Sequence, residues 1–490
     1  MDQMESIHFG TDGWRGVIAR EFTYDNVARV GEAVARYLKS QERQDLDAYK
    51  RWNATPTDWQ QGVVVGYDMR FQARAFAIHL ARVLNQRGIP AWVTPDAVPT
   101  PVVAHGVVQR NAALGLMVTA SHNPPDYLGV KIKTELGGAA GPEITGLVEQ
   151  FLPNDVPEVD EAGMPDEVDV RTPYLQRLAQ LIDIRLLQKA PLRVVVDAMH
   201  GSARGYVAAL LEDLQIPYVQ VRHERNPEFG GTPPEPVERY VTPLKAVVAA
   251  EKARRRDNRL LVGLVTDGDG DRVAAADEHG HYVDPHRCYA LLFRHLLQKG
   301  LSGRAVKSFT LTDMAAKLAA GHDMPIDEVP VGFKHISEKL LTEDVLIGGE
   351  ESGGIAVKGH IPERDGVLIG LLLLEAVARE GKLVSRLVDA LMAEVGAHHF
   401  QRHDLHLEER LEAVERIADA RPETFAGRPV REIETLDGLK LRFDDGWLLF
   451  RASGTEPVLR VYCEMDDPQK VTELINEGVK VARGERELWS

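Results

Sequence analysis

The chain has 490 residues, which is too long for one hydrophobic core and predicts three or four domains. It carries 58 Lys and Arg against 74 Asp and Glu, so its formal net charge is −16. This acidic balance argues against nucleic acid as the main partner. We find no secretory signal and no apolar run of membrane length, so we expect a cytoplasmic protein with no membrane partner.

The first part of the chain predicts an α/β unit in which the connection before the strand at 63–66 is longer than a minimal loop. The apolar run at 63–66 predicts a buried strand, and residues 73–80 predict a helix after it. Residues 41–61, before this strand, are polar and contain tryptophan. We interpret them as a surface insertion to which the sequence assigns no role.

A second apolar run, at 114–118, ends just before the polar segment Thr119-Ala-Ser-His-Asn-Pro124. By itself, such a segment is usually only a turn after a strand. The hydroxyl of Ser121 can also carry a phosphoryl group. A phosphoserine brings nearly two negative charges at neutral pH, so something must neutralise them.

The run at 261–265 precedes Asp267-Gly-Asp-Gly-Asp-Arg272, where three carboxylates alternate with glycine. The glycines allow a tight turn that brings Asp267, Asp269 and Asp271 to one point. Three carboxylates and a phosphoryl oxygen suit Mg²⁺. The two segments together therefore predict a phosphorylated serine held by a metal.

Two other kinds of aspartate loop have similar spacing. A calcium loop needs glycine at its sixth position, where this chain has Arg272, and it needs flanking helices where this chain has apolar, strand-like sequence. The loop also resembles the nucleophile loop of haloacid-dehalogenase-type phosphotransferases, in which the first aspartate is phosphorylated. Asp271 stands where that family usually has threonine, and no later Gly-Asp-x-x-Asn-Asp follows. An aspartyl-phosphate enzyme stays the second interpretation.

Two later loops have compositions suited to a phosphorylated sugar. Gly348-Gly-Glu-Glu-Ser-Gly-Gly354 follows the apolar run at 345–347, and its carboxylates and hydroxyl can accept hydrogen bonds from sugar hydroxyls. Arg451-Ala-Ser-Gly-Thr-Glu-Pro457 connects two predicted strands, and its guanidinium, hydroxyls and amides can surround a phosphate. Taken alone, each is also compatible with an ordinary turn or hairpin loop.

The end of the chain predicts a closing helix. Asp467 and Pro468 form a suitable N-cap and first-turn pair. The residues that would form its apolar face are Val471, Leu474, Ile475 and Val479. The only cysteines, Cys288 and Cys463, match no metal spacing, so we expect no disulfide framework.

The four loops together closely resemble those of the alpha-D-phosphohexomutase family, of the phosphoglucomutase/phosphomannomutase type, and occur in that family's order. Similar supporting segments are Phe9-Gly-Thr-Asp-Gly-Trp-Arg-Gly16, Gly66-Tyr-Asp-Met-Arg70, Pro99-Thr-Pro101, Asn226-Pro-Glu-Phe-Gly-Gly231 and Gly332-Phe-Lys-His-Ile336. The resemblance extends nearly from end to end. One departure is Leu128, where members often have asparagine before the glycine of the segment containing Lys131.

The resemblance implies a role for each matching residue. The catalytic group would be Ser121 as the phosphoryl carrier, with His122, Arg15 and Lys131 beside its phosphate. Asp267, Asp269 and Asp271 would join that phosphate as ligands of Mg²⁺. Lys131 would move a proton or offset developing charge. Residues implied in substrate binding are Arg272, Lys334, His335, Glu350 and Ser352 at the sugar, and Arg451, Ser453, Gly454 and Thr455 at the distal phosphate.

The resemblance also implies a multidomain α/β fold. Three related mixed α/β domains would span residues 1–165, 166–281 and 282–397. A smaller C-terminal α+β domain would span 398–490, and the four would surround a central cleft. We expect a monomer or a homodimer whose partner is a small phosphosugar. Because water competes as the nucleophile, the cleft is expected to close during turnover.

The implied reaction moves phosphate between C6 and C1 of a hexose through a hexose 1,6-bisphosphate. Phospho-Ser121 would phosphorylate the free end, the sugar would reverse, and Ser121 would take back the other phosphate. Glu351 and the segment 332–334 favour glucose, with mannose second and glucosamine third. A phosphoglucosamine mutase and a non-catalytic phosphosugar sensor stay as further alternatives.

Overall fold

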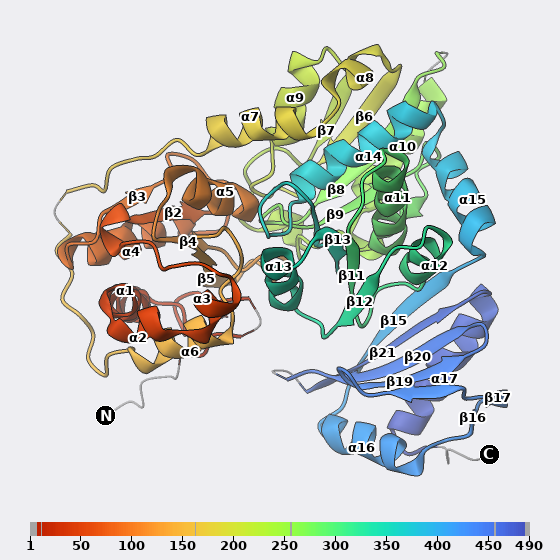
Figure 1. Cartoon of the computed structure of the whole chain (residues 1–490). Helices are drawn as coiled ribbons and strands as arrows, with labels where there is room; N and C mark the ends of the chain where they lie inside the picture. Colours follow the sequence, from red (N-terminus) through yellow and green to blue (C-terminus); the bar gives the residue numbers. More distant parts are fainter. Residues whose placement is uncertain (1–6, 11, 162, 255–256, 455–456, 486–490) are drawn as a thin grey trace. The chain divides into compact units, whose positions relative to one another are not determined.

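The computed structural model describes residues 7–10, 12–161, 163–254, 257–454 and 457–485 (Figure 1). The chain divides into two compact units. The first contains Met1–Arg304 and Gly332–Leu387, and the second contains Ala305–Val331 and Val388–Ser490. Every residue proposed to act on the reacting phosphate or the sugar lies in the first unit.

The first sheet has the strand order β1-β5-β4-β2-β3. Its strands are β1 (Trp14–Val17), β2 (Val63–Tyr67), β3 (Ala91–Val93), β4 (Leu114–Val118) and β5 (Tyr127–Thr134). β2 runs parallel to β3 and β4, whereas β5 is antiparallel to β4 and β1. Every residue of β2 and β4 is buried, as expected for central strands covered on both faces.

The first domain also contains helices, of which α4 and α5 pack directly on this sheet (red to yellow in Figure 1). The helices are α1 (Tyr24–Lys39), α2 (Gln41–Asp45), α3 (Asp47–Arg51), α4 (Ala73–Gln86), α5 (Thr100–Arg110) and α6 (Pro142–Gln150), with a 3₁₀ turn η1 (Trp59–Gln61). The insertion at 41–61 therefore forms short helices. Contrary to a simple surface insertion, Arg43 and Tyr49 are buried, because both contact the carboxylate of Glu135.

The second sheet has the order β10-β9-β8-β6-β7 and repeats the pattern of the first. Its strands are β6 (Leu192–Asp197), β7 (Tyr218–Val221), β8 (Leu260–Thr266), β9 (Val273–Ala276) and β10 (Tyr282–Val283). β6 is parallel to β7 and β8, and β9 is antiparallel to β8, just as β2, β3, β4 and β5 are arranged. The β8–β9 connection thus corresponds to the β4–β5 connection.

Helices of the second domain and of the rest of this unit follow. They are α7 (Arg171–Leu181), α8 (Ile184–Lys189), α9 (Tyr206–Asp213), α10 (Thr242–Arg254), α11 (Pro285–Gln298), α13 (Phe333–Thr342) and α14 (Gly366–Glu380), with η2 (Phe229–Gly231) and η3 (Glu238–Tyr240). Asp365 caps α14 by accepting from the Leu368 amide at 2.9 Å. β13 (Val345–Gly349) and β14 (Ile355–Val357) form an antiparallel pair joined by the turn 350–354.

The second unit contains a parallel strand pair and an antiparallel sheet. β11 (Arg304–Ser308) pairs with β12 (Ile326–Val329), and α12 (Met314–Gly321) lies between them in sequence. The sheet order is β15-β21-β20-β19-β18. These strands are β15 (His399–His406), β18 (Glu432–Glu434), β19 (Leu439–Phe443), β20 (Gly446–Ala452) and β21 (Val458–Met465). The remaining elements of this unit are α16 (Arg410–Ala420), β16 (Thr424–Phe425), β17 (Arg428–Pro429) and α17 (Pro468–Ala482), and α15 (Val384–Val395) begins in the first unit and ends in the second.

The secondary structure confirms the apolar runs as strands and residues 73–80 as helix, although that helix continues to Gln86. The closing helix also forms as predicted, with Asp467 accepting from the Gln469 amide at 2.8 Å. Cys288 and Cys463 are buried free thiols. Within the described part of the chain, no helix has the length and apolarity needed to cross a membrane.

Candidate active site

Ser121 lies in the loop between β4 and β5, in a backbone conformation that favours glycine. Its φ is +51°, which strains a residue with a side chain. The Ser121 amide donates to Thr119 Oγ1 at 2.8 Å, and the Ser121 carbonyl accepts from Arg70 Nη2 at 2.7 Å. These bonds on both sides hold the strained residue in place. The hydroxyl therefore has a fixed position at the end of a buried strand.

Arg70 organises the whole loop rather than Ser121 alone. Its guanidinium also donates to the carbonyls of Asn123 and Pro124, both at 2.7 Å. Asp68 accepts from Arg70 Nε at 3.2 Å and from the Thr119 hydroxyl at 2.6 Å, and burial raises the pKa of Asp68 to about 6. Asp68 and Arg70 belong to the family-like segment 66–70, but the sequence analysis gave neither residue a role.

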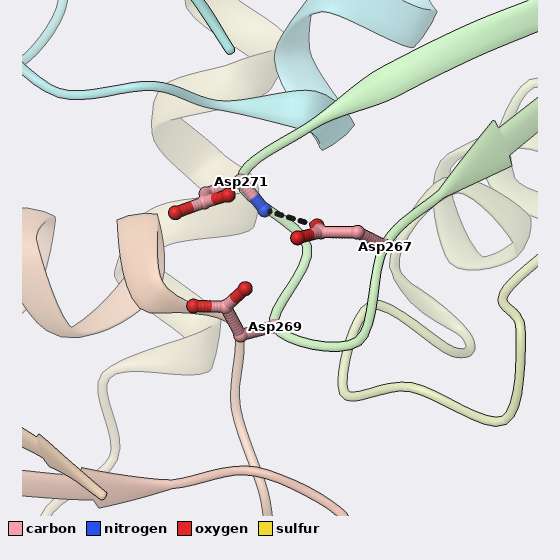
Figure 2. Close-up of side chains that lie close together, drawn as sticks. All are labelled: Asp267, Asp269 and Asp271. Atoms are coloured by element: carbon pink, nitrogen blue, oxygen red, sulfur yellow. Dashed lines mark hydrogen bonds between the residues drawn. The ribbon is translucent and has the colours of Figure 1, made fainter. Parts of the chain in front are cut away.

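The three aspartates lie on the loop between β8 and β9, and all three are fully buried (Figure 2). One ligand oxygen from each lies within 4.8 Å of the others. Asp267 Oδ1 accepts from the backbone amides of Asp271 at 3.0 Å and Arg272 at 3.1 Å, which turns the loop on itself. The Oδ1 atoms of Asp269 and Asp271 have no hydrogen-bond partner among the described residues.

These carboxylates fit a divalent metal. Buried carboxylate oxygens are normally hydrogen-bonded, so two of them without donors in one cluster indicate a missing positive partner. Burial and the neighbouring carboxylates of Asp271 and Asp269 raise the pKa of Asp267 well above its usual value. A hard cation with oxygen ligands, such as Mg²⁺, would relieve that repulsion. The cluster could therefore hold a metal ion.

The serine loop and the aspartate loop touch. Ser121 Oγ donates to Asp267 Oδ2 at 3.1 Å. Gly268 makes the approach possible, because a Cβ there would lie 2.5 Å from the Ser121 carbonyl oxygen. Thr100, from the family-like segment 99–101, donates from its hydroxyl to Asp269 Oδ2 at 2.5 Å. Residues 146 positions apart in the sequence thus share one site.

Lys131 lies at the centre of a buried ionic network. Its ammonium is 2.8 Å from Asp269 Oδ2, 3.0 Å from Asp271 Oδ2 and 2.7 Å from Asp12 Oδ2. Burial lowers the pKa of Lys131, but these three carboxylates outweigh burial and raise it above its usual value. Lys131 in turn lowers the pKa of Asp269 against the opposing effect of burial. The structure therefore holds Lys131 as a cation.

Arg364 connects the aspartate loop to the turn between β13 and β14, and the sequence analysis did not identify it. Its Nη2 lies 2.9 Å from Asp271 Oδ2 and also donates to Asp12 Oδ2. Its Nη1 lies 3.7 Å from Glu350 Oε2. The sequence around Arg364 contains no motif that would identify it as a site residue. Asp12 was within a family-like segment but had no assigned role.

His122 and Arg15, predicted beside the phosphate, and Arg272, predicted at the sugar, lie around the two loops. His122 Nδ1 is 3.4 Å from Ser121 Oγ, and burial together with Arg272 and Arg15 holds the pKa of His122 well below its usual value. Arg15 donates to the side chain of Asn123. Arg272 Nε lies 4.0 Å from Asp267 Oδ2 and 3.9 Å from Asp271 Oδ1. His122 and Arg272 thus lie beside the serine and the aspartates, whereas Arg15 contacts the serine loop through Asn123.

Glu350 begins the turn between β13 and β14. Its Oε1 accepts from the Gly332 amide at 2.9 Å, and burial raises the pKa of Glu350 to about 7. Gly332 directly precedes α13, whose first turn carries Lys334 and His335, both partly exposed. Ser352 lies on the same turn as Glu350 and is also partly exposed. Four of the five residues predicted at the sugar thus come from two adjoining segments, and the fifth, Arg272, lies on the aspartate loop.

The predicted phosphate loop lies in the second unit and connects β20 to β21. Arg451 Nε is 3.0 Å from Asp437 Oδ2. The Ser453 carbonyl accepts from Arg410 Nε at 2.8 Å. A Cβ on Gly454 would meet no atom within 4 Å, so this glycine faces open space. Thr455 lies outside the described residues.

Family models match the chain in four consecutive parts. They describe the phosphoglucomutase/phosphomannomutase alpha/beta/alpha domain I at residues 6–156, domain II at 172–280, domain III at 284–395 and the C-terminal domain at 404–481. The chain belongs to the phosphoglucomutase/phosphomannomutase family. The predicted family and the mixed α/β fold class are confirmed, and the chain is an enzyme of the phosphohexomutase class.

Individual relatives agree on the family and differ in the sugar. A phosphoglucomutase/phosphomannomutase of Thermococcus kodakarensis is 29% identical, over 96% of this chain and 98% of its own length. A phosphoglucosamine mutase of Limosilactobacillus reuteri is 28% identical, over 99% and 100%. A solved structure of a Thermus thermophilus protein, described as a phosphomannomutase, has a TM-score of 0.85 and 35% identity, over 98% of this chain and all of that one.

Proposed function

We propose that the enzyme interconverts hexose 1-phosphate and hexose 6-phosphate through a phosphoserine at Ser121 and a hexose 1,6-bisphosphate. The observation that carries the proposal is the 3.1 Å contact between Ser121 Oγ and Asp267 Oδ2. It brings a hydroxyl to three carboxylates that could hold a metal, in a loop that fixes the serine backbone. An aspartyl-phosphate enzyme would have no use for a strained serine at this point.

In the first transfer, the bond between phosphorus and Ser121 Oγ breaks as a bond forms to the free sugar hydroxyl. The hydroxyl proton replaces the phosphoryl group on Ser121 in the overall exchange. A Mg²⁺ held by Asp267, Asp269 and Asp271 would supply positive charge to the phosphoryl oxygens. Lys131, held as a cation beside Asp269 and Asp271, offsets charge that develops during transfer.

The second transfer needs the same sugar in the opposite orientation. Glu350 and Ser352 would accept hydrogen bonds from the sugar hydroxyls, with Lys334, His335 and Arg272 beside them. These side chains suit hydroxyl groups at either end, because carboxylates and hydroxyls accept from any vicinal pair. The non-reacting phosphate would bind to Arg451, Ser453, Gly454 and Thr455. Closing of the enzyme over the bisphosphate would exclude water.

Glucose is the proposed preferred hexose, followed by mannose and then glucosamine. Glu351 and the segment 332–334 support this order, whereas the phosphoglucosamine mutases among the relatives oppose it. Specificity constants for the three hexose phosphates test the order, and equal values would contradict it. The domain boundaries near residues 165, 281 and 397, a cytoplasmic location and a monomer or homodimer complete the proposal.

Mass spectrometry of the freshly purified protein tests the phosphoserine. We expect one phosphate, located on Ser121 by peptide analysis, that leaves when excess hexose monophosphate is added. No phosphate on Ser121, even after incubation with glucose 1,6-bisphosphate and Mg²⁺, would overturn the proposal. Ser121→Ala should abolish most turnover while sugar phosphate binding persists. Near-normal turnover of Ser121→Ala with an inactive Asp267→Ala would favour the aspartyl-phosphate enzyme instead.

A further inference from the structure

Residues 41–61, here called the strap, are fixed to the first domain by a buried carboxylate. Arg43 donates to Glu135 Oε1 at 2.8 Å, and the Tyr49 hydroxyl donates to the same atom at 3.1 Å. The Thr57 amide adds a third bond at 3.1 Å. A buried ion pair is costly unless further hydrogen bonds support it, and here Glu135 Oε1 accepts all three of these bonds, although Arg43 Nε has no partner among the described residues. The strap is therefore a built part of the domain.

The middle of the strap contacts helix α13. Arg51 Nε lies 2.8 Å from Glu338 Oε1, and Trp52 Nε1 donates to Glu338 Oε2 at 2.6 Å. Both oxygens of one carboxylate are thus used by neighbouring strap residues. Arg51 also contacts Glu143 Oε1 of α6 at 2.6 Å through its other nitrogen. The strap therefore ties α13 to the first domain with a defined orientation.

Glu338 is on the same face of α13 as the predicted sugar-binding residues. It follows His335 by three positions and Lys334 by four, which places all three on neighbouring turns of one helix face. The N-terminal end of α13 is held separately, because the Gly332 amide donates to Glu350 Oε1 at 2.9 Å. Ser337 donates to the Pro362 carbonyl at 2.8 Å. The helix thus has the sugar loop at one end and the strap along the side.

We propose that the strap positions α13 so that Lys334 and His335 are presented to the hexose in the orientation that binds it. Arg51, Trp52 and Glu338 act as positioning residues and do not touch the substrate. The inference rests on the proposed function, since Lys334 and His335 have this role only if the sugar binds beside them. Without the strap, α13 would spend part of its time in orientations that do not bind the hexose. The apparent Kd would then equal the intrinsic Kd divided by the fraction of molecules in the binding orientation.

The loss of such positioning affects substrate binding and transition-state binding equally. It should therefore raise KM and leave kcat nearly unchanged. Trp52→Phe keeps an aromatic side chain but removes the N–H donor to Glu338 together with the five-membered ring of the indole, and Arg51→Ala removes the second contact. We expect each variant to raise KM and the calorimetric Kd for glucose 6-phosphate by about fivefold, and kcat to change by less than about twofold.

Lys50→Ala is the matched control. Lys50 is on the same strap helix but forms its ion pair with the exposed Asp47, at 2.7 Å. This variant should keep the wild-type KM. Arg51→Lys should recover part of the affinity lost in Arg51→Ala. The melting temperature of each variant shows whether the domain stays folded. Because Glu338 and Trp52 contact each other, the double variant of Glu338→Gln and Trp52→Phe should raise Kd by less than the product of the two single effects.

Unchanged KM and Kd in Trp52→Phe and Arg51→Ala, with a wild type that turns over hexose phosphate, would overturn the positioning role and leave the proposed function intact. An equal loss in Lys50→Ala, or a fall in kcat that follows the melting temperature, would also overturn it, because general destabilisation would then explain the effect. Absence of hexose phosphate turnover by the wild type would overturn the proposed function. The calorimetric Kd values of wild type and variants would then still test whether the strap contributes to hexose phosphate binding. A wild type that binds no hexose phosphate would overturn both.

Discussion

Arg70 donates from Nη2 to the backbone carbonyl of Ser121 at 2.7 Å, and this bond makes a distant arginine part of the phosphoryl carrier's loop. The same guanidinium is paired with Asp68, which is also bonded to Thr119. Arg70 and Asp68 are both fully buried apart from traces of surface. The position of the reactive hydroxyl is thus determined by residues that would never touch the sugar.

Arg70→Met should cost both stability and activity. Removal of one partner of a buried pair leaves Asp68 uncompensated, which typically costs about 3–5 kcal/mol. The serine loop also loses its four backbone contacts, so kcat should fall by about a hundredfold. Chemical denaturation and turnover measure the two effects. The double variant Asp68→Asn with Arg70→Met should recover stability but not kcat, and recovered kcat would contradict a role in placing Ser121.

Much of the fold was predictable because it depends on local patterns. The uninterrupted apolar runs at 114–118 and 261–265 predict buried strands and form them, and Ser121 and the three aspartates lie on the loops that directly follow. Arg364 was not predictable, since its contacts with Asp271 and Glu350 depend on how distant segments fold together. The strap was misjudged for the same reason, because Arg43 is buried only through its pairing with Glu135.

Gly268→Ala should separate the serine loop from the aspartate loop. A Cβ at this position would lie 2.5 Å from the Ser121 carbonyl, which is closer than nonbonded atoms approach. A displacement of about 1 Å at a reacting group can cost a hundredfold in rate, so we expect kcat to fall by at least about tenfold. Gly141→Ala is the control, because its Cβ would meet nothing within 4 Å. Steady-state kinetics of both variants measure the effect. A kcat of Gly268→Ala equal to that of the wild type would contradict a tight contact between the serine loop and the aspartate loop.

Magnesium should stabilise the enzyme through the three buried aspartates. A ligand that binds only the folded state contributes about 2.7 kcal/mol at a concentration of 100 times its Kd. Mg²⁺ should therefore raise the melting temperature of the wild type. Asp269→Asn, which changes a carboxylate whose Oδ1 lacks a partner among the described residues, should abolish this rise, whereas Asp126→Asn, at an exposed position of the serine loop, should keep it. An equal rise in all three proteins would place the metal elsewhere.

Glu350 should make sugar binding depend on pH. Burial raises the pKa of Glu350 to about 7, so below that pH the group is a neutral acid, and above it a carboxylate that accepts hydrogen bonds from sugar hydroxyls. The phosphate of the substrate also titrates near pH 6, but equally for wild type and variant. The ratio of Kd for Glu350→Gln to Kd for wild type should therefore rise as pH passes 7. Calorimetry between about pH 5.5 and 8.5 measures it, and a constant ratio would contradict contact with the sugar.

The raised pKa of Glu350 also predicts that ionisation, which should favour sugar binding, lowers the free energy of unfolding of the wild type. Because the folded-state pKa lies above the unfolded value near 4.5, ionised Glu350 costs the native state free energy as pH rises from about 4.5 to 7. Glu350→Gln removes that cost, so its stability relative to wild type should improve by up to about 3 kcal/mol between pH 5 and pH 8. Urea denaturation at the two pH values checks the sign. A stability of Glu350→Gln relative to wild type that does not improve from pH 5 to pH 8 would contradict the raised pKa of Glu350.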